Sequence, residues 1–201
     1  KDSHSFGIAS YTKENGEKVY IEISLPVILY DNGFKFFMSS DFKHGKKTVS
    51  KNENYYRLYY HKNKIYKTDK DGTFIYDESN KLINEKPIDF SITKNVVVMI
   101  FTAAFMLWLF ISLARSYKSN RGVSKGMGRF FEPIVLYVRD EIAKPNIGKN
   151  YKKYMSFLLT IFFFVLFLNL LGLTPIGINV TGNIAVTFSL AILTFIITNI
   201  T

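Results

Sequence analysis

The feature that most constrains this chain is a run of 48 residues, from Tyr154 to Thr201, without a single Asp, Glu, Lys, Arg or His. A helix needs about 20 apolar residues, each rising about 1.5 Å, to cross a hydrocarbon core of roughly 30 Å. Pro175 and Gly177 interrupt the run near its middle. The sequence therefore predicts two membrane-spanning helices, over about 154–174 and 184–201, joined by a tight turn.

A further uncharged segment lies upstream, over residues 95–114, and Arg115 and Lys118 follow it directly. Basic residues after about 20 uncharged ones are typical of the end of a transmembrane helix. A buried helix of a soluble protein is the alternative, but the length and the basic end favour the membrane. The fold class predicted for the chain is thus an α-helical membrane protein with three transmembrane helices.

The connector between the first two spans, residues 115–153, carries 10 basic and 3 acidic residues, whereas residues 1–94 carry 16 and 13. Because short loops rich in Lys and Arg stay in the cytoplasm, this connector is expected on the cytoplasmic side. An anionic membrane surface then explains the positive charge, and no nucleic acid is expected as a partner. The N-terminal region is expected outside the cytoplasm, with a targeting peptide before Lys1 and further membrane segments after Thr201.

Within the connector, apolar residues recur at three- and four-residue steps from position 129 onward, which predicts an amphipathic helix. Pro133 is expected in its first turn and Pro145 at its end, because proline disrupts the interior of a helix. The apolar stripe is expected to lie on the membrane or against a neighbouring subunit. The stripe consists of Phe130, Ile134, Val135, Val138 and Ile142, of which Phe130, Ile134 and Val138 are the expected contact residues.

Residues 1–90 are predicted to form a small antiparallel β domain, followed by a membrane domain over 91–201. Asn15-Gly16, Asp31-Asn32-Gly33 and Asp71-Gly72 favour tight turns, because Gly and Asn accept a positive φ. Runs rich in strand-forming residues lie between these turns. They cover residues 19–24, 34–39, 55–60, 64–68 and 73–76.

Residues that support catalysis or bind metals are sparse. The chain has no Cys, which excludes disulfides and thiolate sites. His4, His44 and His61 share no short spacing and are interpreted as surface residues rather than as a metal site. No catalytic residue, metal site or cofactor is therefore expected.

Asn169 interrupts the apolar run of the second span, and burying an unpaired amide in hydrocarbon is costly, so its side chain should face protein or water. Polar residues continue toward the outer end of the hairpin. Two interpretations stay open, the lining of a hydrated path, and hydrogen bonding between helices together with a polar turn at the membrane interface. The candidate path residues are Asn169, Thr174, Thr181, Asn183 and Thr187.

Three segments resemble a known family. They are FFEPIVLYVRDEIAKPNIG (130–148), NLLGLTP (169–175) and TGNIAVTFSLAILTFIIT (181–198). Together they are similar to subunit a of the F-type ATP synthase membrane sector, and NLLGLTP is the most specific of them. The resemblance covers roughly Asp89 to Thr201, and the region before it looks like an extension found in some bacterial members.

The resemblance implies a non-catalytic stator subunit of the bacterial inner membrane, packed against the c-ring and the peripheral-stalk b subunits. Members of the family provide two offset aqueous half-channels for protons. Asn169 matches a family asparagine near the outer half-channel. Gly172 and Asn183 stand where some members carry an acid, and Ala185 stands where others carry Asn. The family's arginine is absent from 154–201, so a scaffold and part of the outer inlet are expected here.

A membrane-anchored binding protein is the alternative, in which the β domain recognises an external ligand. A long apolar helix with one buried Arg after Thr201 favours the synthase subunit, and a short tail favours the anchor. A soluble nucleic-acid binder is disfavoured by the three uncharged runs.

Overall fold

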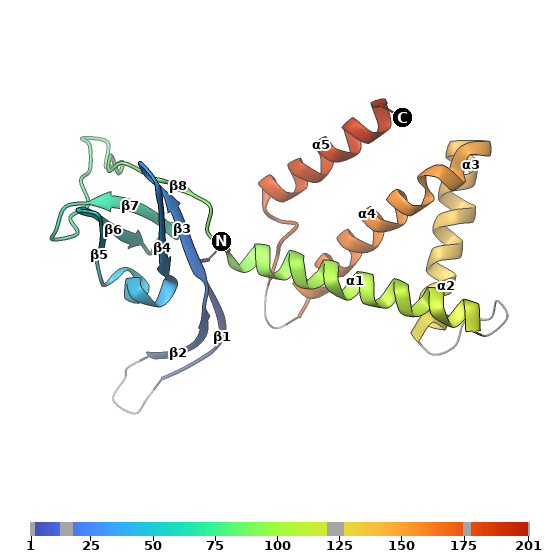
Figure 1. The fold of residues 1–201 in the computed structure, drawn as a ribbon, viewed down its shortest axis with the longest axis horizontal. Helices are drawn as coiled ribbons and strands as arrows, with labels where there is room; N and C mark the ends of the chain where they lie inside the picture. Colours follow the sequence, from blue (N-terminus) through green and yellow to red (C-terminus); the bar gives the residue numbers. More distant parts are fainter. Residues whose placement is uncertain (1–2, 13–17, 120–126, 175–177, 201) are drawn as a thin grey trace. The chain divides into compact units, whose positions relative to one another are not determined.

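The computed structural model describes residues 3–12, 18–119, 127–174 and 178–200. They form two compact units, unit 1 (Lys1–Val97) and unit 2 (Val98–Thr201) (Figure 1). Each unit has an apolar core of its own. The boundary falls inside helix α1 (Lys94–Ser119). The turn expected at Asn15-Gly16 and the helix break expected at 175–177 lie outside the described residues.

Unit 1 is built from three small antiparallel sheets. The first pairs β1 (Ser5–Thr12) with β2 (Lys18–Ser24). The second has the order β4-β3-β8, from Phe34–Met38, Pro26–Tyr30 and Ile88–Asp89. The third has the order β5-β6-β7, from Val49–Lys51, Asn54–Tyr59 and Lys64–Thr68. A 3-10 helix, η1 (Ser39–Gly45), follows β4.

Four of the five predicted strands are present, as β2, β4, β6 and β7. The prediction for 73–76 is wrong, because this segment forms no strand and only bridges at Tyr76 to Leu82. The turn at 31–33 is confirmed. Asn32 and Gly33 adopt positive φ angles of 51° and 124°, which bring Tyr30 opposite its strand partner Phe34.

A polar network lies at the edge of the core of unit 1. The Tyr56 hydroxyl donates to Asp31 Oδ2 at 2.6 Å, and Lys35 Nζ donates to the Tyr56 oxygen at 2.7 Å. Lys67 Nζ lies 3.2 Å from the same Asp31 oxygen. Because buried charges are tolerated only when paired, Asp31 allows Lys35 to be buried. The apolar part of the core consists of Val27, Leu29, Phe42, Val49 and Ile65.

These contacts shift the ionisation of both acidic groups. The hydrogen bond from Tyr56, together with Lys67 and Lys35, holds the pKa of Asp31 below its ordinary value, although burial opposes this. Burial and the bond to Asp31 raise the pKa of the Tyr56 hydroxyl. Asp31 is therefore a carboxylate, and Tyr56 a neutral donor, over the whole physiological range of pH.

Unit 2 is helical. After α1 come α2 (Met127–Tyr137), a π-helical turn η2 (Val138–Ala143), α3 (Lys144–Ile147), a 3-10 turn η3 (Gly148–Asn150), α4 (Tyr151–Gly172) and α5 (Ile184–Ile200). The path from α2 to α3 turns a corner into α4 (Figure 1). At this corner Gly148 has a φ of 70°, which glycine adopts without strain.

Two helical segments, Lys94–Ser116 and Arg129–Gly172, are long and apolar enough to cross a membrane. The first includes the predicted span 95–114, and the second includes the predicted span 154–174. α5 has 17 residues and falls below that length. Length and composition thus support two of the three predicted spans.

The predictions for the two prolines of the connector are wrong. Pro133 lies inside α2 rather than in its first turn, and Pro145 lies within α3 instead of ending the helix. The Lys144 N–H donates to the Arg139 carbonyl oxygen, five residues earlier, as in a π-helix. This wider turn before Pro145 gives its ring room, so the helix continues until Gly148.

Aromatic rings hold the helices of unit 2 together. Phe131 of α2 contacts Phe163 and Phe167 of α4, with ring centroids 6.1 and 5.8 Å apart. Phe110 of α1 contacts Phe163 at 5.0 Å. Such edge-on pairs contribute about 0.5–1.5 kcal/mol each beyond the burial of area. The cluster fixes α4 against α1 and α2, and so positions the end of α4.

We expect Asp31→Asn to destabilise unit 1 by about 3 kcal/mol, the order found when one partner of a buried ion pair is removed. The amide keeps the shape of the carboxylate but leaves the Lys35 ammonium, 2% exposed, without its counter-ion. Hydrogen–deuterium exchange of β3 and β6 in the detergent-solubilised chain measures the loss. Asp41→Asn is the matched control, because its carboxylate is exposed and accepts from the Met38 N–H.

The pH dependence checks the same prediction. The pKa of Asp31 is lower in the folded chain, so the unfolded chain takes up a proton first as the pH falls. The contribution of Asp31 is complete above about pH 4 and is lost as the pH falls through the folded value. Wild-type protection should fall with acid more steeply than that of Asp31→Asn, and parallel curves would contradict the assignment.

Candidate functional site

The polar residues predicted from the sequence lie where α4 ends and α5 begins. α4 ends at Gly172. The Leu173 N–H donates to the carbonyl oxygens of Asn169 and Leu170, at 3.2 and 3.1 Å. Asn169 is thus one turn from the end of α4. Residues 178–183 then lead into α5, which begins at Ile184.

Among the described residues, a single hydrogen bond connects the end of α4 with the segment before α5. Thr181 Oγ1 donates to Asn169 Oδ1 at 2.7 Å, across 12 residues of sequence. The Asn169 side chain is exposed, and its Nδ2 atom has no partner among the described residues. The amide is therefore half-paired, with its oxygen used inside the chain and its N–H groups available to water or a neighbouring chain.

The other predicted residues bond within their own segments. Asn183 Oδ1 accepts from the Ala185 N–H at 3.1 Å and so caps the start of α5. Thr174 and Thr187 each donate to the carbonyl oxygen three residues earlier, at 2.6 and 3.2 Å. The structure therefore joins Asn169 to Thr181, and no hydrogen bond in the described part of the chain joins the other three to this pair.

The chemistry available at this site is that of amides and hydroxyls. Residues 154–201 contain no Asp, Glu, Lys, Arg or His, so no carboxylate, ammonium or imidazole lies on the hairpin. Amide N–H groups and hydroxyls can orient water through hydrogen bonds but do not exchange protons near neutral pH. The site is suited to holding water at the end of an apolar helix.

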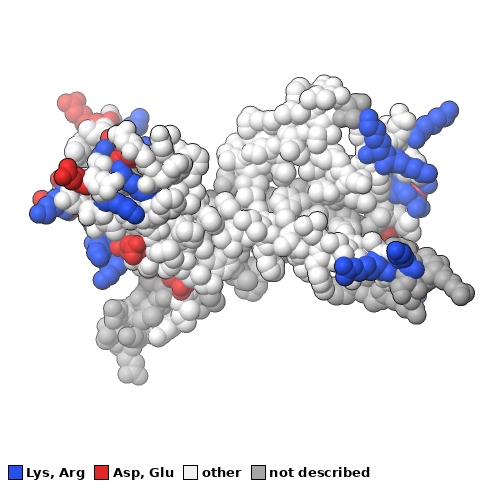
Figure 2. All heavy atoms as spheres, viewed as in Figure 1, with Lys and Arg blue, Asp and Glu red and all other residues white. Residues whose placement is uncertain are grey.

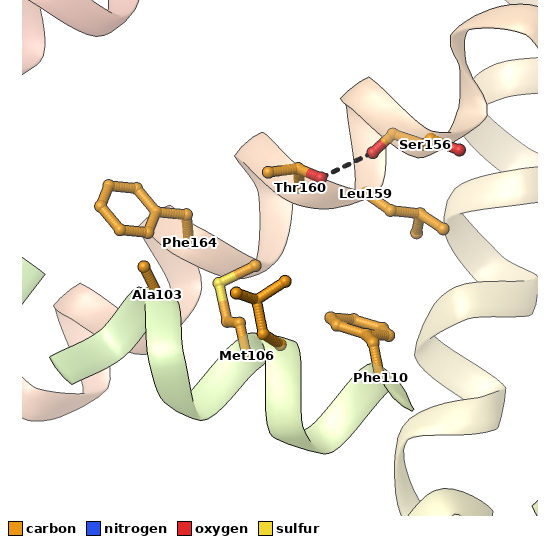
Figure 3. A pocket seen from close by; sticks show the side chains of 8 residues that line it. Ala103, Met106, Phe110, Ser156, Leu159, Thr160 and Phe164 are labelled. Carbon is orange, nitrogen blue, oxygen red and sulfur yellow. Dashed lines mark hydrogen bonds between the residues drawn. The ribbon is translucent and has the colours of Figure 1, made fainter. Parts of the chain in front are cut away.

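A groove of about 470 Å³ between α1 and α4 was not predicted from the sequence. Figure 3 shows Met106 and Phe110 of α1 facing Leu159 of α4 across it. Its two hydroxyl residues lie on α4, where Thr160 Oγ1 donates to the Ser156 carbonyl oxygen at 2.8 Å. The wall is therefore apolar, of a kind that an acyl chain or an apolar helix covers.

The predicted amphipathic stripe is divided by the structure. Phe130 is 71% exposed, whereas Val138 is completely buried. Ile134 is partly buried and packs against the aromatic cluster of α1, α2 and α4. The stripe thus serves mainly as packing inside unit 2, and Phe130 is the one of the three whose side chain is largely exposed.

The sequence gives no sign of one further arrangement, in unit 1. His4, His44 and His61 lie around two adjoining pockets, which meet at the start of β1, at η1 and at the turn after β6. Such long separations along the chain form no motif, so no spacing rule finds this group. The interpretation of His4 as a surface residue is wrong, because its side chain is buried. Within the described residues no three His, Asp or Glu side chains form a group that could hold a metal ion.

We expect Thr181→Val to loosen the segment over 178–183 by about 1 kcal/mol, the net value of a typical hydrogen bond. Valine keeps the size of threonine but removes the donor to Asn169 Oδ1. Faster amide exchange in this segment, with α1 unchanged, is the expected result. Thr194→Val is the control, because its hydroxyl donates to the Leu190 carbonyl oxygen within α5. Equal effects of both variants would argue against a link between the two arms.

Comparison with known proteins matches the two parts of the chain separately. Residues 96–201 match the family described as ATP synthase A chain, and residues 1–90 match a domain of unknown function (DUF8433). ATP synthase subunit a 2 of Prosthecochloris aestuarii is 45% identical over 114 residues, which are 56% of this chain and 35% of that protein. ATP synthase subunit a of Myxococcus xanthus is 44% identical over 115 residues, 56% of this chain and 38% of that protein.

The matched segment is thus about a third of the length of these curated relatives. No solved structure matches the chain.

Proposed function

The chain belongs to the ATP synthase A chain family, and we propose that it forms the part of a stator subunit a that contributes to the outer proton half-channel beside the rotating c-ring. In this role the chain is not catalytic. It supports the passage of protons from water to a ring carboxylate, so that their movement drives ATP synthesis. The membrane potential supplies about 2.3 kcal/mol per proton for each 100 mV.

The observation that carries this proposal is the half-paired amide of Asn169. Its oxygen is bonded to Thr181, while its Nδ2 donors lack a partner among the described residues at the end of the apolar helix α4. Unpaired donors are costly in hydrocarbon, so this side chain faces either water or another subunit. A water-filled inlet between this end of α4 and the c-ring satisfies the requirement.

The proposed topology has three spans, with α1, α4 and α5 crossing the inner membrane of a bacterium. α5 is about 25 Å long at 1.5 Å per residue, slightly less than a hydrocarbon core of roughly 30 Å. Its large apolar side chains nevertheless face outward, as expected for contact with lipid or other subunits. The exposed ones are Ile184, Phe188, Ile192, Leu193, Phe195, Ile196 and Ile200.

The charges of unit 2 support a cytoplasmic position for the connector. Figure 2 shows Lys and Arg gathered over the end of α1 and around α3 and the start of α4, while the intervening helical surface is free of charge on this face. The connector 115–153 therefore faces the cytoplasm, and the N-terminal domain lies outside it. The partners in this proposal are the c-ring, the peripheral-stalk b subunits and lipid, which cover the exposed apolar surfaces of the helices.

We expect Asn169→Leu, placed in the complete subunit within the synthase, to slow proton-driven ATP synthesis about fivefold. This is the rate equivalent of about 1 kcal/mol from one lost hydrogen bond to water. The measurement is ATP synthesis by membrane vesicles under an imposed proton gradient, normalised to the amount of assembled complex on native gels.

Asn199→Leu is the matched control, because Asn199 Nδ2 is already satisfied by the Phe195 carbonyl oxygen in α5, at 2.7 Å. The control should synthesise ATP at nearly the wild-type rate. Unchanged synthesis in Asn169→Leu, or equal losses in both variants, would refute a role of Asn169 in the inlet.

The exposed ring of Phe130 gives a second test, of assembly. We expect Phe130→Ser to lower the fraction of the subunit recovered in the purified synthase, because it removes apolar area from a contact surface. Val138→Ser should instead lower the free energy of unfolding of the chain itself by about 1–3 kcal/mol, because it buries an unpaired hydroxyl. Full recovery of Phe130→Ser in the complex would remove this residue from the proposed interface.

A further inference from the structure

A polar pocket lies in unit 1, in the part of the chain that matches only a domain of unknown function. It consists of a cavity of about 340 Å³ and an adjoining one of about 30 Å³. Glu22, His44 and Tyr60 line both cavities, and His4 lines the smaller one. The larger volume is within the range of small-molecule sites, and the smaller one is about the size of one water molecule.

His4 brings an unused acceptor to this pocket. The side chain is 6% exposed, and its Nε2 lies 2.9 Å from Asp89 Oδ2. Burial raises the pKa of Asp89, but the bonds with His4 and Ser91 outweigh it and keep the pKa below its ordinary value. Asp89 is then a carboxylate that only accepts, so Nε2 of His4 carries the hydrogen between them. In the tautomer with its single hydrogen on Nε2, Nδ1 is an acceptor.

The Nδ1 atom has no partner in the described part of the chain. A buried acceptor without a donor costs free energy, and such a group in a native structure calls for a ligand or a water. His4 lines the small cavity, so its ring forms part of the wall of the pocket.

The rest of the lining selects against an anion. Although the chain has 26 Lys and Arg residues, none is among the described residues that line either cavity. Glu22 is the carboxylate of the pocket, with Oε1 3.3 Å from His44 Nε2. The ring of Tyr60 stands edge-on to His44, with centroids 6.3 Å apart. A carboxylate, an imidazole acceptor and an aromatic ring together suit a donor that carries positive charge.

We propose that this pocket binds a small molecule through a protonated primary amine, whose N–H groups donate to His4 Nδ1 and to the Glu22 carboxylate. The proposal is independent of the synthase role of unit 2. The amine can belong to a free diamine or to an amino sugar, since both offer the same ammonium group. The larger cavity accommodates the remainder of the molecule.

The test is isothermal titration calorimetry on the full chain in detergent, with putrescine and glucosamine as amine probes and succinate and glucose as controls. We expect saturable binding of at least one amine. Binding of putrescine or of glucosamine then shows whether the ammonium group of the ligand belongs to a diamine or to an amino sugar. Neither control should bind. The proposal would be overturned if the wild-type protein bound neither amine, or bound glucose or succinate as tightly as an amine. It would also be overturned if a separate titration showed that the pocket binds Zn²⁺ and no amine.

Two substitutions separate the site from the fold. Glu22→Gln removes the charge, and His4→Gln keeps a donor toward Asp89 but removes the acceptor at Nδ1. Each should weaken amine binding at least tenfold, while Glu78→Gln, which is exposed and lines neither cavity, should leave it unchanged. Amide exchange of β3 confirms that the variants are folded, and unchanged affinity in folded Glu22→Gln would contradict the assigned contact.

Discussion

Unit 2 depends on one constraint, which is that hydrocarbon offers no partner for a polar group. The helices satisfy their own backbone, and most of their polar side chains return to it as well. Thr160, Thr194 and Thr198 each donate to the carbonyl oxygen four residues earlier, at 2.7–2.8 Å, and Asn199 does the same through its amide. Asn169 departs from this rule, because its oxygen is bonded to Thr181 outside α4. A polar side chain that is not hydrogen-bonded to the backbone of its own helix needs water or another partner in its place.

Unit 1 meets the cost of burying polar groups differently, by pairing charges. Lys35 is almost completely buried, and this is possible because Asp31 and Tyr56 surround its ammonium with acceptors. His4 is paired on one side only, toward Asp89, and the other nitrogen of its ring has no partner among the described residues. The two buried groups differ in that respect. The Lys35 network is paired within the chain, whereas the His4 pair leaves one ring nitrogen without a partner, beside the pocket that we propose binds an amine.

The sequence predicts the features that depend on local composition. Uncharged runs of sufficient length locate α1 and α4, and the single amide in an apolar run identifies Asn169. Features that depend on contacts between segments far apart in the sequence cannot be predicted from local composition. The helical turn before Pro145 widens and lets the helix pass the proline, which a rule about prolines alone does not anticipate. The bond from Thr181 to Asn169 and the meeting of His4 with His44 arise only when segments far apart in sequence are folded together.

The absence of titratable groups from 154–201 also constrains how the proposed inlet works. A carboxylate near the end of α4 would bind a proton tightly when burial raised its pKa, and release would then limit the flow. The amide of Asn169 and the hydroxyl of Thr181 remain neutral, so they hold water in place without holding a proton. A proton in such an inlet passes from water to water until it meets a titratable group of another helix or of the ring. In this proposal the proton gradient and the ring set the direction of proton movement, and the contribution of the hairpin is to keep the water continuous.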